Sequence, residues 1–217
     1  MLSLHALAAK DLGRYEVLKL VAGKRTLVIG PVSHKPSEMD DQRNRGVWTF
    51  DYKAAYCSRV VGVDISTEGV EYMRQLGYEA HQGDVQALRL DETFECVTLS
   101  NVVDHLLDLP GFLHSCHDLL EPGGRLIIYD DNPLCIPVLI RNRLKHGPGM
   151  GIAHDNVTKV QPDLYKNFVG RFGFEVEKLE YLSAKPRARM LYTALRPLLD
   201  WPQLLHTNYI CVLRRTD

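Results

Sequence analysis

The sequence predicts an α/β fold in which a doubly wound parallel sheet carries helices on both faces. Short apolar runs alternate with stretches of helical periodicity through the first 130 residues. The run Val60–Ile65 is apolar almost throughout, as expected for a strand covered on both faces. The expected strands are 26–30, 59–65, 78–83, 94–100 and 124–130, and the expected helices are 3–22, 48–57, 67–76 and 110–120.

The pattern changes after Asp130. Residues 133–157 contain three prolines and three glycines, which is typical of a lid or a binding loop. Helical character resumes at 162–171, and strands are expected at 174–182 and 209–213. We therefore expect a single domain over 1–217, in which segments 133–157 and 183–205 are insertions that cover the substrate.

Composition and charge exclude several classes of protein. The net charge of −1 argues against broad binding to nucleic acid, and no apolar run is long enough to predict a membrane partner. The segment from Pro137 to Asp217 is nonetheless basic, with 13 Lys and Arg against 7 Asp and Glu. This predicts either a solvated helical face or a site for an acidic substrate. Five cysteines without CxxC spacing, and no basic start typical of a signal peptide, favour a reducing, cytoplasmic location.

Asp64 is the most informative residue. It ends the second expected strand, and a carboxylate at that position of an open α/β sheet holds the hydroxyls of a nucleotide ribose. The first strand ends in Gly30-Pro31-Val32-Ser33, which has only one glycine of the dinucleotide fingerprint, and no phosphate loop is present. A nucleoside without phosphates is therefore the better ligand. A helix cap is the alternative role for Asp64.

Several segments, in order, resemble the class I S-adenosylmethionine (SAM)-dependent methyltransferases. The resemblance covers about Thr26 to Arg215, in the small-molecule type, with a degenerate first glycine motif. It is carried by the strands 26–30 and 60–65, by Gly83-Asp84-Val85, by 94–106, by LLEPGGRLII at 119–128, and by His154 to Glu175. The resemblance implies a Rossmann-like seven-stranded sheet of order 3-2-1-4-5-7-6 with the last strand antiparallel. It also implies SAM as cofactor and S-adenosyl-L-homocysteine as product.

The resemblance also implies a set of cofactor contacts. Asp64 would hold the ribose, Asp84 the adenine amino group, and Ser100 with Asn101 the methionine portion. Segment 31–47 is longer than usual for the family, and we expect it to be a polar loop whose first residues cradle the cofactor. The full expected set is Gly30, Pro31, Val32, Ser33, Asp64, Ile65, Asp84, Val85, Ser100 and Asn101. For the polar members, local turn capping is the alternative.

Two histidines are candidates for a general base. His105 follows the fourth strand, and His154 ends the Gly/Pro-rich segment, where a lid would reach the cofactor. Structural histidines are the alternative at both positions, and His34 is a weaker third candidate. His114 and His117 lack an acidic third ligand nearby, so no metal site is expected. One of Tyr129, Asp130, Asp131 and Asn132 is a candidate for positioning the substrate.

The predicted function is methyl transfer from SAM to a small-molecule acceptor, with a hydroxyl preferred to an amine. A catalytically silent methyltransferase-like binding protein and an NAD-linked oxidoreductase are the alternatives. An RNA methyltransferase is disfavoured by the near-neutral charge. The acceptor and the oligomeric state stay open.

Overall fold

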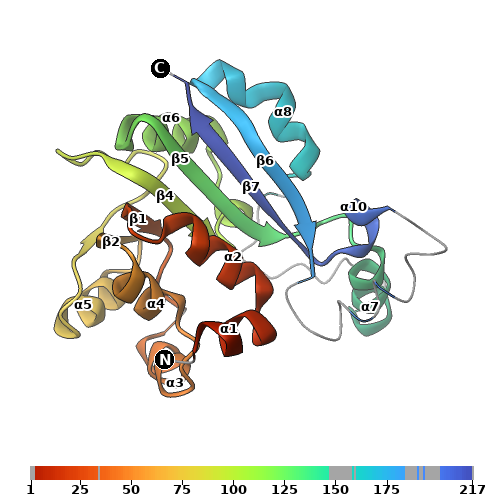
Figure 1. Cartoon of the computed structure of the whole chain (residues 1–217), viewed down its shortest axis with the longest axis horizontal. Helices are drawn as coiled ribbons and strands as arrows, with labels where there is room; N and C mark the ends of the chain where they lie inside the picture. Colours follow the sequence, from red (N-terminus) through yellow and green to blue (C-terminus); the bar gives the residue numbers. More distant parts are fainter. Residues whose placement is uncertain are drawn as a thin grey trace.

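A computed structural model describes residues 3–33, 35–146, 158, 160–183, 190, 193 and 201–216. Its centre is a seven-stranded sheet of order β3-β2-β1-β4-β5-β7-β6, as predicted (Figure 1). Neighbouring strands from β3 to β5 pair in parallel, whereas β7 is antiparallel to both β5 and β6. The strands are β1 (Arg25–Ile29), β2 (Arg59–Asp64), β3 (Ala80–Gln82), β4 (Phe94–Ser100), β5 (Leu120–Asp131), β6 (Phe174–Leu182) and β7 (Asn208–Arg215).

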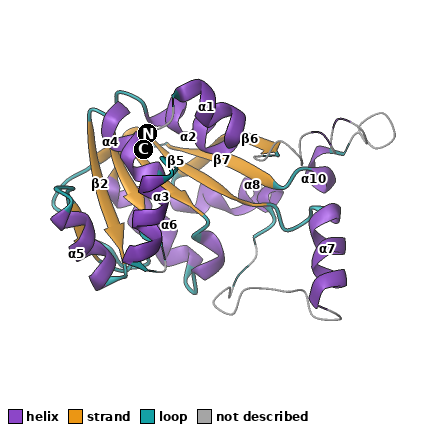
Figure 2. Cartoon of the chain, turned by 90° about the horizontal axis from the view of Figure 1, so that it is seen from below, coloured by secondary structure: helices purple, strands orange, loops and turns teal. Residues whose placement is uncertain are grey.

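Helices cover both faces of the sheet, as its apolar strands require (Figures 1 and 2). Strand β1 shows why, because Leu27 and Ile29 enter one apolar core while Val28 enters another. On the face of Val28 pack α2 (Leu12–Val21), α4 (Thr49–Tyr56) and α5 (Thr67–Gln75). On the opposite face pack α6 (Leu109–Leu119) and α8 (Tyr165–Phe168).

Two expected elements differ from the structure. The single helix expected over 3–22 is two helices, α1 (Leu4–Lys10) and α2, because Asp11 takes an extended conformation and its side chain caps α2 at the Arg14 N–H. The polar loop expected over 31–47 contains a helix, α3 (Pro36–Asn44). Proline at the first turn suits a helix start, and Met39 on α3 is fully buried.

The strand expected at 124–130 begins earlier, because Glu121-Pro122-Gly123-Gly124 lies within β5. The pairing register with β4 shifts between Phe94 and Cys96, which accommodates the extra residues as an irregularity of the strand. Gly123 takes a φ of +75° there, a conformation that glycine adopts readily.

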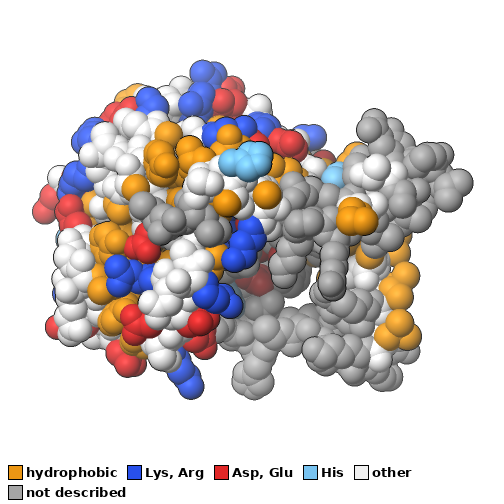
Figure 3. Space-filling model, turned by 60° about the horizontal axis from the view of Figure 1, so that its bottom comes forward, with side chains coloured by type: hydrophobic (Ala, Val, Ile, Leu, Met, Phe, Trp, Pro, Cys, Tyr) orange, Lys and Arg blue, Asp and Glu red, His pale blue; other side chains and the backbone are white. Residues whose placement is uncertain are grey.

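The first predicted insertion, 133–157, contains a helix in its described part. This helix, α7 (Ile136–His146), contacts the short α10 (Pro202–Leu205) beyond one end of the sheet (Figures 1 and 2). It carries four exposed apolar side chains, and apolar atoms gather on its side of the molecule (Figure 3): Ile136, Leu139, Ile140 and Leu144. Residues 147–157 and most of 184–200 lie outside the described residues, so a covering role for the insertions stays a prediction.

Candidate cofactor site

A pocket of about 740 Å³ lies at the carboxyl ends of β1 to β4, a volume suited to one small ligand. We call it the strand-end pocket. All ten expected cofactor residues line it, and so does His105. Tyr129, a candidate for positioning the substrate, also lines it, as does Gly83. Its wall further includes residues that were not named as candidates from the sequence: Arg14, Ile29, Glu38, Gln42, Trp48, Thr49, Val63, Ser66, Gln86, Val102 and Leu106.

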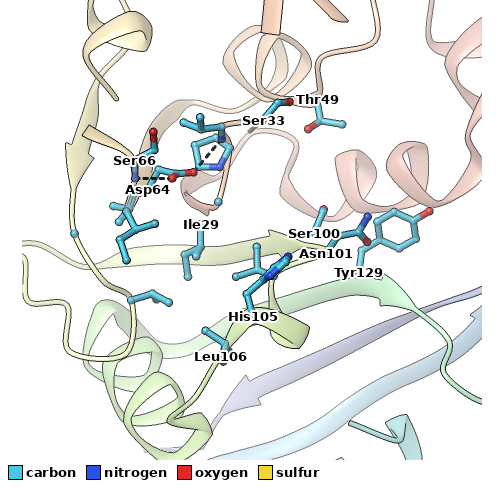
Figure 4. Close-up of a pocket in the computed structure, with 18 of the residues that line it drawn as sticks. Ile29, Ser33, Thr49, Asp64, Ser66, Ser100, Asn101, His105, Leu106 and Tyr129 are labelled. Carbon is cyan, nitrogen blue, oxygen red and sulfur yellow. Dashed lines mark hydrogen bonds between the residues drawn. The ribbon is translucent and has the colours of Figure 1, made fainter. Parts of the chain in front are cut away.

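Asp64 faces this pocket and joins the ends of β1 and β2. Its Oδ2 accepts from the Val32 N–H at 3.1 Å, and its Oδ1 accepts from the Ser66 N–H at 2.9 Å (Figure 4). Burial raises the pKa of Asp64, and the backbone donors at Ser66 and Val32 oppose that shift. A carboxylate has about four acceptor positions, so two remain for ribose hydroxyls. The alternative role as helix cap is filled by Ser66, whose Oγ accepts from the Gly69 N–H at 3.1 Å.

The loop after β1 is shaped by one glycine and by the inserted α3. Gly30 has a φ of +65°, and a Cβ atom there would lie 2.5 Å from Cγ2 of Val102. The Trp48 ring N–H donates to the Pro31 carbonyl at 3.0 Å, and the Gln42 amide donates to Ser33 Oγ at 2.6 Å. These two bonds tie residues 31–33 to α3 and to the start of α4, while their role as a cofactor cradle stays a prediction.

The ends of β3 and β4 bring the remaining expected residues to opposite sides of the pocket. Asp84 lies at the β3 end, where its Oδ1 accepts from the Gln86 N–H at 2.9 Å. Asn101 follows β4 with a φ of +55°, and among the described residues it is the only non-glycine with a positive φ. Its N–H donates to the Tyr129 carbonyl at 3.1 Å, which ties β4 to β5. Such a conformation outside glycine often marks a functional turn.

His105 is the candidate base that the structure places in the pocket. It ends a short 3₁₀ helix, η1 (Val103–His105), and its ring lies between Asp64 on one side and Ser100 and Asn101 on the other (Figure 4). Its Nε2 is 3.6 Å from Oδ1 of Asp104. The other candidates, His154 and His34, lie outside the described residues.

The remaining polar candidates separate into two groups. Tyr129 lines the pocket, and Asp130 is buried and accepts from the Val103 N–H at 3.3 Å. Asp131 accepts from the Asn208 amide, and Asn132 donates to the carbonyls of Gln203 and His206, so both fix the β5–β7 end. His114 and His117 pack edge-on against the rings of Phe172 and Phe174. Within the described residues no cluster of three metal-ligating side chains occurs.

Arg14 and Thr49 are the most informative residues that the sequence reasoning missed. Arg14 comes from α2 and donates from Nη1 to the Val47 carbonyl at 3.0 Å, while its Nε lies 3.3 Å from Asp11. Thr49 is the first residue of α4 and lies near Ser33 in the pocket wall (Figure 4). No local motif marks either residue, because the contact between α2 and α4 brings them to the pocket.

The fold is an open α/β sheet with a pocket at the carboxyl ends of its strands, where such sheets bind ligands. Residues 45–128 match the methyltransferase domain family. A mitochondrial ubiquinone biosynthesis O-methyltransferase of Homo sapiens is 28% identical over 122 residues, which cover 54% of this chain and 31% of that protein. A ubiquinone biosynthesis O-methyltransferase of Burkholderia ambifaria is 30% identical over 129 residues, covering 56% of this chain and 50% of that protein.

Solved structures show the same fold at low identity. A SAM-dependent methyltransferase from Mesorhizobium loti superposes with a TM-score of 0.60 at 17% identity, covering 94% of this chain and 98% of that one. A possible histamine N-methyltransferase from Thermotoga maritima superposes with a TM-score of 0.61 at 18% identity, covering 99% and 91%. The chain is therefore similar to class I SAM-dependent methyltransferases, over residues 45–128 in sequence and over nearly its whole length in fold. It spans half or less of the length of the curated relatives described above.

Proposed function

We propose that this chain transfers the methyl group of SAM to a hydroxyl of a small-molecule acceptor. The observation that carries the proposal is the placement of Asp64 and His105 in one pocket at the strand ends. In this proposal Asp64 binds the nucleoside, and the imidazole of His105 removes a proton from an acceptor bound beside the cofactor's methionine portion. The strand-end position of both groups is the usual place for ligands in open α/β sheets.

The reaction is an in-line displacement in which the chain's main task is to position the partners. The acceptor oxygen forms a bond to the methyl carbon while the bond from that carbon to sulfur breaks, so the sulfonium becomes a thioether. The hydroxyl proton passes to the imidazole of His105. Alignment of the two reactants contributes up to about 7–11 kcal/mol to lowering the barrier. A positioned base adds about 10²–10⁴-fold to the rate.

Two observations support a hydroxyl-bearing, partly apolar acceptor. The curated relatives are named as O-methyltransferases of ubiquinone biosynthesis. Helix α7, which follows β5, carries exposed apolar side chains, and we expect them to contact an apolar part of the acceptor. The relatives extend well beyond the matched segment. The reaction is therefore proposed from the residues of this chain and not from the activity of the whole relatives.

The test combines binding and turnover. We expect calorimetry to show SAM binding to the unaltered chain and no binding of NAD. With a catechol-type acceptor and methyl-labelled SAM, His105→Gln should lower kcat by about 10²–10⁴-fold while leaving the affinity for SAM nearly unchanged. The matched control is His5→Gln, since His5 is exposed on α1 and outside the pocket wall.

Three outcomes would contradict the proposal. Absence of SAM binding would remove the cofactor assignment. SAM binding without transfer to any hydroxyl or amine in a small-molecule panel would favour the silent binding protein. An unchanged kcat in His105→Gln would show that His105 is not the general base.

A further inference from the structure

His105 lies on a short segment whose conformation depends on contacts from other elements. We call residues 103–108 the histidine segment. Its regular part is η1, a single 3₁₀ turn, and such turns have poorer hydrogen-bond geometry than an α-helix. Inside this turn the His105 N–H donates to the Val102 carbonyl at 3.0 Å, and the Leu106 N–H donates to the Val103 carbonyl at 3.2 Å. The position of the imidazole in the pocket (Figure 4) is therefore set largely from outside the turn.

Two elements hold the first part of the histidine segment. Asp130 at the end of β5 accepts from the Val103 N–H at 3.3 Å. Thr158 donates from its N–H to the Asp104 carbonyl at 3.1 Å and from Oγ1 to the Leu106 carbonyl at 2.7 Å. The side chains of Val103 and Leu106 are also buried in the core. These contacts fix the segment on the sheet side of His105.

Gln86 holds the last part of the segment. Its Oε1 accepts from the Leu107 N–H at 2.8 Å and from the Asp108 N–H at 2.5 Å. Packing does not fix this part, because the Leu107 side chain is 81% exposed. The backbone of Gln86 lies close against the start of α6, since a Cβ atom at Gly111 would lie 2.7 Å from the Gln86 carbonyl oxygen. The side chain thus starts from a fixed point.

The other end of the same side chain holds Asp84. The Nε2 of Gln86 donates to Oδ1 and Oδ2 of Asp84 at 3.1 Å each, and its backbone N–H donates to Oδ1 at 2.9 Å. The amide fits in one orientation, with its oxygen toward two N–H donors and its nitrogen toward a carboxylate. A carboxylate has about four acceptor positions, so the position left on Oδ2 is available to the amino group of a nucleoside base.

We propose that Gln86 is a positioning residue that links the adenine side of the strand-end pocket to the general base. One amide orients Asp84, which lines the pocket, and anchors the segment that carries His105. The two groups act at distant parts of one cofactor molecule, so their spacing has to match it. A displacement of about 1 Å at a reacting group can lower a rate by up to about 10²-fold. This inference rests on the proposed function, because it takes His105 as the base.

The test asks whether Gln86 acts through His105. Gln86→Leu keeps the size of the side chain and removes both sets of bonds. At saturating SAM and acceptor it should lower kcat by about tenfold. Introduced into His105→Gln, the same substitution should lower kcat little further, because no base is left to position. A purely structural role would lower kcat by the same factor in both backgrounds.

A second variant separates the two ends of the amide and serves if Gln86→Leu does not fold. At pH 8, Gln86→Glu still offers an acceptor to Leu107 and Asp108, but its carboxylate repels that of Asp84. It should therefore retain more of kcat than Gln86→Leu and bind SAM more weakly in calorimetry. The control Gln82→Leu should change neither quantity, since Gln82 lies outside the pocket wall and donates to the Ile65 carbonyl at 3.4 Å.

The outcomes keep this inference apart from the proposed function. If the unaltered chain does not bind SAM, or if His105→Gln leaves kcat unchanged, the proposed function fails. If His105→Gln lowers kcat while Gln86→Leu does not, or if the two losses multiply in full, only the positioning role of Gln86 fails. If Gln86→Glu loses as much kcat as Gln86→Leu, the anchoring of Leu107 and Asp108 does not place the base.

Discussion

The two ends of the strand-end pocket are built in different ways. At the end near β2 and β3, which we propose binds the nucleoside, Asp64 is the last residue of β2 and Asp84 lies two residues beyond β3. Their carboxylates accept from backbone N–H groups within a few residues or on the neighbouring loop after β1. At the opposite end, Arg14 of α2 and Thr49 of α4 line the pocket, and these two helices are brought together by packing. The first end is therefore a property of local sequence, and the second is a property of how two helices pack.

The largest effect is expected at the nucleoside end. Asp64→Ala removes two potential charge-assisted bonds to the ribose, each worth about 1.5–3 kcal/mol, so affinity for SAM should fall about 10²–10⁴-fold. The fold should survive, because Ser66 caps α5 independently of Asp64. Calorimetry measures the affinity, and thermal unfolding checks the fold.

The matched comparison for Asp64 is Asp84→Ala. Asp84 lies in the same pocket, but its bonds with Gln86 are exposed to solvent, so its loss should weaken SAM binding by roughly tenfold. An equal loss of SAM affinity in both variants would contradict the proposal that Asp64 binds the ribose and Asp84 the adenine amino group. Unchanged affinity for SAM in Asp64→Ala would contradict the proposal that the strand-end pocket binds the cofactor through Asp64.

That Asp64 and Asp84 lie at strand ends and line one pocket could be predicted, because strand ends are recognisable from apolar runs, whereas their binding of a nucleoside stays a prediction. The strand order was also predicted, and that prediction came from the resemblance to class I SAM-dependent methyltransferases. The helix α3 was missed, since its polar sequence gives no amphipathic signal and only Met39 anchors it in the core. Arg14 was missed for a related reason. Its position depends on Gly13, whose missing side chain lets the ring of Tyr129 approach α2 closely.

The second effect is on the stability of the free protein. The pKa of Lys53, a buried residue of α4, falls from 10.5 to about 8 in the folded chain, chiefly through burial, with Arg14 and Cys57 as its charged or titratable neighbours. Between these values the unfolded chain holds the proton and the folded chain does not, so stability rises with pH across that window. Below about pH 8 the buried charge costs on the order of 3 kcal/mol.

Removal of that charge should therefore stabilise the free protein. At pH 7, Lys53→Met should unfold at a higher denaturant concentration than the unaltered chain, and the difference should shrink as the pH approaches 10. Lys19→Met should differ little from the unaltered chain over the same range, since Lys19 is a half-exposed lysine of α2 paired with Glu16. A destabilised Lys53→Met, or a difference independent of pH, would show that the buried ammonium group already has a favourable environment without ligand.

The smallest effect concerns Gly30, which lies between the two ends of the pocket. Gly30 and Gly23 have φ values of +65° and +74°, so alanine at either position is strained by about 1 kcal/mol. At Gly23 an added Cβ meets nothing within 4 Å, whereas at Gly30 it lies 2.5 Å from Cγ2 of Val102, a stiff β-branched side chain. Gly30→Ala should therefore cost about 1–3 kcal/mol more than Gly23→Ala in chemical denaturation, and it alone should weaken SAM binding. Equal costs in the two variants would mean that Val102 moves freely, and the loop after β1 would then not be fixed by the close approach of the segment that follows β4.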